Sequence, residues 1–124
     1  MKLRRIFLLT CVFSLAATTV FAQDVLKVVG GAEAHKILLE NDQVRVLDVR
    51  VPPGHKIEMH SHPANVVYYV SDYKIKATSP DGKVALREGK AGTAVSFGPT
   101  THAIENAGDT EFHLVQVEMK GAAK

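Results

Sequence analysis

The chain has 124 residues, a length typical of one domain, and its 15 Lys and Arg against 13 Asp and Glu give a formal net charge of +2. Three of those basic residues, Lys2, Arg4 and Arg5, precede the first apolar run, so the rest of the chain carries 12 basic residues (15 − 3) against 13 acidic ones, a net charge of −1. This balance excludes the basic surface that binds nucleic acid or an anionic membrane.

The N-terminal stretch has the three parts of a secretory signal peptide. A basic start is followed by an apolar run of about 16 residues that ends at Phe21, and Ala22 precedes the polar Gln23. A membrane-spanning helix needs about 20 apolar residues, and no basic residues follow this run, so an anchor is disfavoured. We therefore expect residues 1–22 to be cleaved and the remainder to be exported, periplasmic or secreted, without membrane contact afterwards.

Beyond the leader, the chain is patterned as short strands separated by turns rich in Gly and Pro. Short strands at intervals of about 8–12 residues indicate an all-β sandwich or barrel. Ser79-Pro80-Asp81-Gly82 predicts a hairpin turn in which Gly82 takes a positive φ. The expected strands are residues 44–51, 55–62, 66–70, 74–78, 83–88, 93–97, 102–105 and 110–119, with shorter ones at 25–29 and at 36–39, the latter after a helical turn from residue 31.

Three histidines suggest the chemistry of a site. His60 and His62 are two residues apart in an expected strand and therefore point to the same face, and His102 lies on a later strand. Three neutral imidazoles can hold a divalent metal and leave positions open for a small molecule. Ser61 points to the opposite face, which excludes a serine nucleophile paired with these histidines.

The segments around these histidines resemble the two sequence motifs of the cupin family. Gly54 is followed by five residues and then by His60-Ser61-His62, as in the first motif. Gly92 opens a strand, a Pro-containing turn follows, and His102 precedes Asn106 by four residues, as in the second. The resemblance is to small single-domain cupins of the RmlC-like type, some described as dioxygenase-like or linked by name to β-alanine degradation.

The resemblance implies a fold, a metal and a ligand set. The fold is all-β, a single cupin-type jelly-roll β-barrel over residues 23–124 with its core at about 41–120. The metal, which could be Fe, Mn, Ni or Zn, is carried in such proteins by two histidines, a glutamate and a third histidine. Here the glutamate position falls on Val66, which cannot bind a metal. Glu58, on the strand of the first two histidines, and His113, on the last strand, are candidate extra ligands.

The walls of the expected pocket come from the strands that flank the histidines. Tyr68 has a polar tip that could contact a ligand, whereas Tyr69, on the opposite face, is expected to pack within the sheet. His35 and His55 are expected to be solvated. The residues expected to line the pocket are Val66, Tyr68, Phe97 and Ile104.

Two functions remain open from the sequence. One is an exported metal-dependent enzyme, of dioxygenase-like type, that acts on a small organic molecule. The other is a non-catalytic cupin with a degenerate metal site that binds a metal or a small ligand. No residue pattern identifies a catalytic group, so enzymatic activity is undecided. We also expect a homodimer, because a small barrel has exposed sheet edges and residues 25–29 have no evident partner strand.

The first testable prediction concerns the leader. The exported protein should begin at Gln23, because the residues around Ala22 fit a signal-peptidase site. Intact-mass measurement of protein recovered from outside the cytoplasm checks it, and a mass that includes residues 1–22 would refute both export by this route and the net charge of −1.

Overall fold

The computed structural model describes residues 22–121, so all but the last residue of the expected signal peptide lies outside the described part. Within that range, no helix is both long and apolar enough to cross a membrane. The elements in chain order are η1 (Val25–Lys27), α1 (Gly31–Ala34), β1 (His35–Glu40), β2 (Val44–Val51), β3 (Lys56–His62), β4 (Asn65–Tyr69), β5 (Tyr73–Thr78), β6 (Val84–Gly89), β7 (Ala94–Phe97), β8 (Thr100–Asn106) and β9 (Phe112–Met119).

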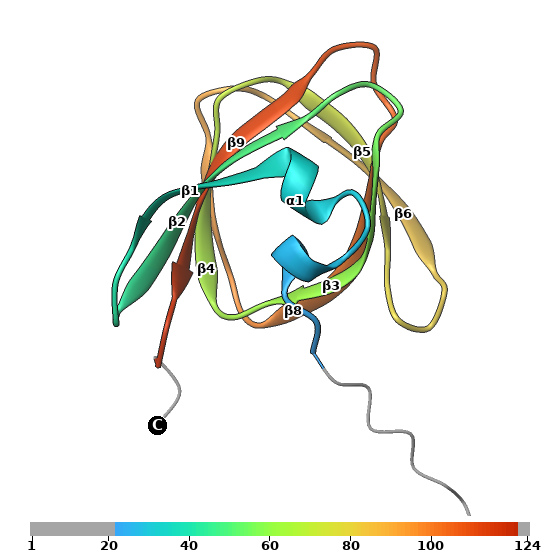
Figure 1. Cartoon of the computed structure of the whole chain (residues 1–124). Helices are drawn as coiled ribbons and strands as arrows, with labels where there is room; N and C mark the ends of the chain where they lie inside the picture. The colour runs from blue at the N-terminus through green and yellow to red at the C-terminus, as the bar shows by residue number, and fades with distance from the viewer. Residues whose placement is uncertain (1–21, 122–124) are drawn as a thin grey trace, which may run out of the picture.

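The strands form two antiparallel sheets that enclose the core between them (Figure 1). One sheet has the order β1-β2-β9-β4-β7 and the other β3-β8-β5-β6. This is the all-β jelly roll that the sequence predicts. The two sheets do not close into a continuous barrel, because no ladder of hydrogen bonds joins them among the described residues, and each sheet keeps its own edge strands.

Alternating burial along the strands builds the core. In β2, Leu47, Val49 and Val51 are buried while the residues between them are more exposed, and Phe112 and Leu114 do the same in β9. This period of two is expected for a sheet with one face against a core. Burying a side chain of this size stabilises the fold by about 1.5–3 kcal/mol relative to leaving it in water.

The local sequence signals for turns and short elements hold. The β5–β6 hairpin turns at the expected position, with Gly82 at a φ of 83° and the Ser79 N–H bonded to the Lys83 carbonyl at 2.9 Å. The expected helical turn and strand near residues 31 and 36 are the short helix α1 and the strand β1.

The N-terminal segment is not the strand expected at residues 25–29. Val25 begins a 3₁₀ turn and is fully buried, and the Asp24 side chain caps this turn by accepting from the Leu26 N–H at 2.9 Å. The Ser61 N–H donates to the Gln23 carbonyl at 2.7 Å, so the segment covers the edge of β3. In Figure 1 these blue and cyan turns lie between the two sheets. A free N-terminal strand therefore no longer argues for a dimer.

Candidate metal centre

Two neighbouring strands bring three histidines together. His60 and His62 lie on β3, and His60 pairs directly with His102 on the adjacent strand β8. One ring nitrogen from each of the three residues lies within 4.8 Å of the others, and the ring centroids of His60 and His102 are 4.8 Å apart. The structure thus brings together the three histidines that the sequence singles out.

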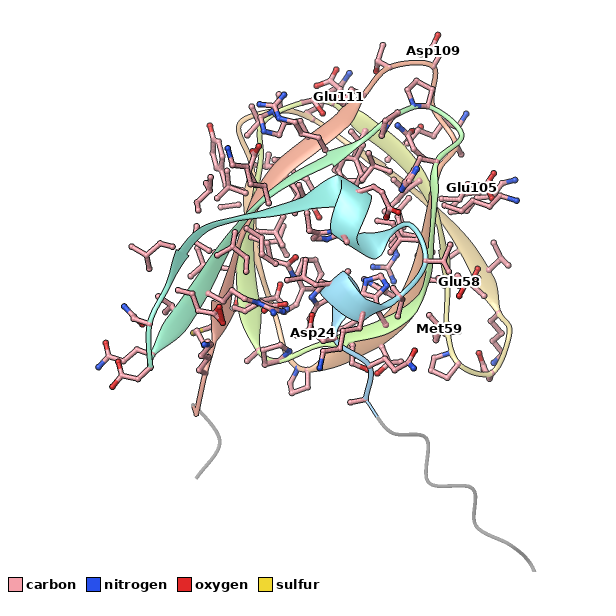
Figure 2. All side chains as sticks on the ribbon, in the orientation of Figure 1. Asp24, Glu58, Met59, Glu105, Asp109 and Glu111 are labelled. Atoms are coloured by element: carbon pink, nitrogen blue, oxygen red, sulfur yellow. The ribbon has the colours of Figure 1, made fainter. Side chains whose placement is uncertain are left out.

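A β-bulge decides which residues of β3 face inward. The pairing of β3 with β8 shifts between Ile57 and His60, so both of these residues are buried although they are three positions apart. Glu58 is consequently exposed and lies outside the ribbon (Figure 2). The expectation that Glu58 shares a face with the histidines and adds a ligand is wrong, because it assumed a regular strand. Its backbone carbonyl, however, does serve the site.

Hydrogen bonds fix the tautomer of two of these rings. The Nδ1–H of His60 donates to the Glu58 carbonyl at 2.7 Å, and the Nδ1–H of His62 donates to the Glu118 carboxylate at 2.7 Å. Because both acceptors lack a proton to give, the lone pair of each ring is on Nε2. Such outer partners orient the histidine ligands of metal sites and raise their basicity.

The carboxylate behind His62 belongs to a buried chain of charges. Glu118 accepts from Arg45 Nε at 2.6 Å, and Arg45 in turn donates to Asp24 at 2.7 Å. Burial alone would raise the pKa of Glu118, but the hydrogen bonds from His62 and Arg45 lower it overall. Glu118 therefore stays ionised although it is only 2% exposed. Sequence reasoning missed Arg45 and Glu118, because their partners come from distant strands.

Burial keeps His60 and His102 neutral. Loss of hydration lowers the pKa of His60 to about 4 and that of His102 to about 3, and the neighbouring rings add to the decrease. Neutral imidazoles offer their lone pairs to a metal without first losing a proton.

A fourth histidine lies beside the cluster. His35, the first residue of β1 directly after α1, is buried and not solvated as expected. Its Nδ1–H donates to the Gly31 carbonyl at 2.8 Å, and its ring centroid is 6.4 Å from those of His60 and His62. His35 lies outside the group of three close nitrogens, so it faces the site without completing it.

The cluster opens into a cavity of about 700 Å³ between the sheets. Phe97 and Ile104 line this cavity, as expected. Val66 and Tyr68 do not: they are 38% and 48% exposed and point away from it, while Tyr69 lines it. The sequence interpretation reversed the two faces of β4 because both carry apolar residues.

Asn65 occupies the inner face of β4 close to the histidines. It pairs with Glu118 on β9, whose carboxylate contacts His62, and it lines the cavity. Its Nδ2 donates to the Pro63 carbonyl at 2.8 Å, and its buried Oδ1 has no hydrogen-bond partner in residues 22–121. An orphaned buried acceptor is costly and points to a binding partner.

His113 faces away from the three histidines. The sequence makes it a candidate extra ligand on the condition that it faces inward, but the buried residues of β9 are those of opposite parity, beginning with Phe112. The Nε2–H of His113 donates to the Asp48 carboxylate at 2.7 Å on the outer face.

Another part of the cavity is aromatic. Tyr69 stacks on Tyr73 with ring centroids 4.4 Å apart, and Tyr73 lies 5.0 Å from Phe112. All three residues line the cavity. Burial raises the pKa of Tyr69 well above its usual range, so its hydroxyl stays protonated.

Comparison with known proteins identifies the fold. No family model matches the chain, and no curated protein matches it either. Among solved structures, a cupin domain from Bordetella pertussis is 26% identical, with a TM-score of 0.65 over 70% of this chain and 92% of that one. The chain has the cupin fold. A Klebsiella pneumoniae protein with a double-stranded β-helix domain is also 26% identical (TM-score 0.58, 73% and 78% covered), and a cupin 2 conserved barrel domain protein from Salinispora arenicola is 21% identical (TM-score 0.54, 71% and 75% covered).

The donor set of the cluster fits a divalent transition metal. Three imidazole nitrogens converge from two strands, two of them in a fixed tautomer, and imidazole is a good ligand for Zn, Ni and Fe. Val66, at the position that the motif gives to glutamate, points outward, so its side chain takes no part in the site.

The second testable prediction is a pH dependence of stability. The pKa of a histidine in the unfolded chain is about 6.5, whereas in the folded protein the pKa of His60 is about 4 and that of His102 is about 3. The unfolded state therefore binds more protons between these values, and the metal-free protein should lose stability as the pH falls from 6.5 to 5, each pKa unit being worth about 1.4 kcal/mol.

Urea unfolding at pH 7, 6 and 5 measures this loss. The variant His102→Gln should lose less stability over the same range, because one depressed titration is gone. Equal losses in parent and variant would contradict the burial argument, since exposed carboxylates titrate mostly below this window.

Proposed function

We propose that this cupin binds a divalent metal through His60, His62 and His102 and that the metal holds a small organic molecule in the adjoining cavity. The observation that carries the proposal is the convergence of three ring nitrogens within 4.8 Å at the wall of a cavity of about 700 Å³. A volume of this size is typical of sites for small molecules. The metal could be Fe, Mn, Ni or Zn.

In such a site, some residues would bind the metal and others would orient the residues that bind it. The three histidines would hold the ion, while Glu118 and the Glu58 carbonyl keep two of the rings in the tautomer that presents Nε2. A metal bound by three protein ligands can polarise a substrate oxygen or activate water. The cavity walls restrict water and strengthen electrostatic interactions inside.

Turnover and simple binding are both compatible with this arrangement. A dioxygenase-like reaction would consume oxygen together with an organic substrate. Binding without turnover gains support from the cavity wall of the described chain, which contains neither Asp nor Glu and so lacks a free carboxylate to act as a base. Oxygen uptake by the metal-loaded protein with a panel of small organic molecules separates the two functions.

The proposal also covers where the protein acts and whether it forms a homodimer. We infer that the domain acts in the periplasm or outside the cell, supported by the leader-like sequence of residues 1–22. We also infer a homodimer, supported by the outer face of the five-stranded sheet, where Leu39, Val66 and Tyr68 are each more than a third exposed.

The third testable prediction is the loss of metal from a ligand variant. His102→Ala should reduce the metal content from stoichiometric to background, because it removes one of three nitrogens and leaves the bond between His62 and Glu118 intact. Elemental analysis of protein purified from its native compartment measures the content. His113→Ala, on the outer face, is the matched control and should keep its metal.

Circular dichroism must show that both variants are folded. Full metal content in folded His102→Ala protein would rule out the three-histidine site in favour of a metal-free ligand pocket.

The fourth testable prediction concerns a carboxylate introduced by substitution on β4. Asn65→Asp places an anionic oxygen on the inner face and should tighten metal binding by about 10-fold, the scale of one supporting contact. Without metal the variant should be less stable by about 1–3 kcal/mol, because a carboxylate would face the Pro63 carbonyl in place of the amide donor.

Zinc titration and urea unfolding measure the two effects. Val66→Glu adds a negative charge one residue away on the exposed face and should change neither quantity. If Val66→Glu tightens metal binding and Asn65→Asp does not, the inner and outer faces of β4 are assigned the wrong way round.

A further inference from the structure

The cavity wall is positively charged. Among the described residues that line it, Lys83 and Arg87 carry charge at neutral pH apart from the histidines, and neither Asp nor Glu is present. Lys83 lies 3.6 Å from the Asp81 carboxylate, and both side chains are largely exposed. Arg87 has no ion-pair partner in residues 22–121, so its guanidinium is available to a ligand.

Strand pairing aims Arg87 into the cavity. It lies on β6 directly opposite Ile75 of β5, and directly paired residues project to the same face of a sheet. Ile75 is 7% exposed and belongs to the core between the sheets. Arg87 lines the same cavity as His102 and Tyr69, and it is itself exposed to solvent, so a ligand can reach its guanidinium.

The rest of the wall is apolar between these polar groups. Tyr69, Tyr73 and Phe112 form a stacked cluster on one side, and Ile104 and Phe97 lie along the strands that lead to the histidines. A ligand that fits this wall has an apolar or aromatic body and one anionic group. A guanidinium binds a carboxylate through two parallel hydrogen bonds, and one guanidinium matches one carboxylate in charge.

We propose that Arg87 binds the carboxylate of a small organic acid whose apolar body occupies the cavity. This assignment rests on the proposed function for its role beside a metal, but it concerns the guanidinium and can be tested without one. The absence of Asp and Glu among the described residues of the wall favours the same ligand, because Lys83 and Arg87 give the wall a net positive charge even before a dication enters.

The test compares an acid with its neutral isostere. Phenylacetate and phenylacetamide are titrated by calorimetry into the metal-free protein and into the zinc-loaded protein, with phenyl phosphate as a third probe. The affinity of the metal-free protein should be about 10-fold higher for phenylacetate than for phenylacetamide, because only the acid forms a charge-assisted hydrogen bond with the guanidinium. Phenyl phosphate should bind no better than phenylacetate.

Three variants assign the preference to a residue. Arg87→Gln should abolish the preference for the acid, and Arg87→Lys should keep part of it. Lys76→Gln is the matched control, because it removes one positive charge from the opposite face of the adjacent strand and should leave the preference intact.

Each outcome decides the matter. Equal affinities for acid and amide, or an undiminished preference in Arg87→Gln, overturn the assignment. A preference that appears only with zinc and survives in Arg87→Gln would assign the carboxylate to the metal, which overturns the role of Arg87 and supports the proposed function. A preference that depends on Arg87 in a protein that binds no zinc would support the role of Arg87 and overturn the metal site.

Discussion

The buried carboxylate of Glu118 is the interaction on which the site depends. It lies on β9 of one sheet, accepts from Arg45 on β2 of the same sheet, and accepts from His62 on β3 of the other. Removing one partner of a buried ion pair costs about 3–5 kcal/mol, so the pair of Glu118 with Arg45 stabilises the arrangement of these strands. The contact between Glu118 and His62 joins the two sheets and also orients the His62 ring.

The sequence predicts the strands well but not the faces of every strand. Alternation and turn residues locate elements such as β2 and the hairpin at Gly82, because both signals are local. The face of β4 is not predictable in this way, since Val66 and Tyr68 outside are as apolar as Val67 and Tyr69 inside. The bulge in β3 that turns Glu58 outward has no local sequence signal, because it arises from pairing with β8.

Some residues of the candidate site are also predictable from the sequence, and others are not. The pair His60 and His62 is visible in the sequence because two residues fix a common face, and the second motif adds His102. Arg45 and Glu118 are 73 positions apart and become partners only when β2 pairs with β9. Alternation could have hinted at Glu118, which shares its face with Phe112 and Leu114, but it could not have named the partner.

The contact between Asp24 and Arg45 connects the start of the described chain to the histidine cluster. Asp24 is two residues beyond the expected processing site, and it is the outermost link of the chain that ends at His62. A leader peptidase that cut three residues further along would deliver a domain with Arg45 deprived of one of its two carboxylates. Processing at the expected site, after Ala22, would keep Asp24 and would therefore preserve every contact from Asp24 to His62.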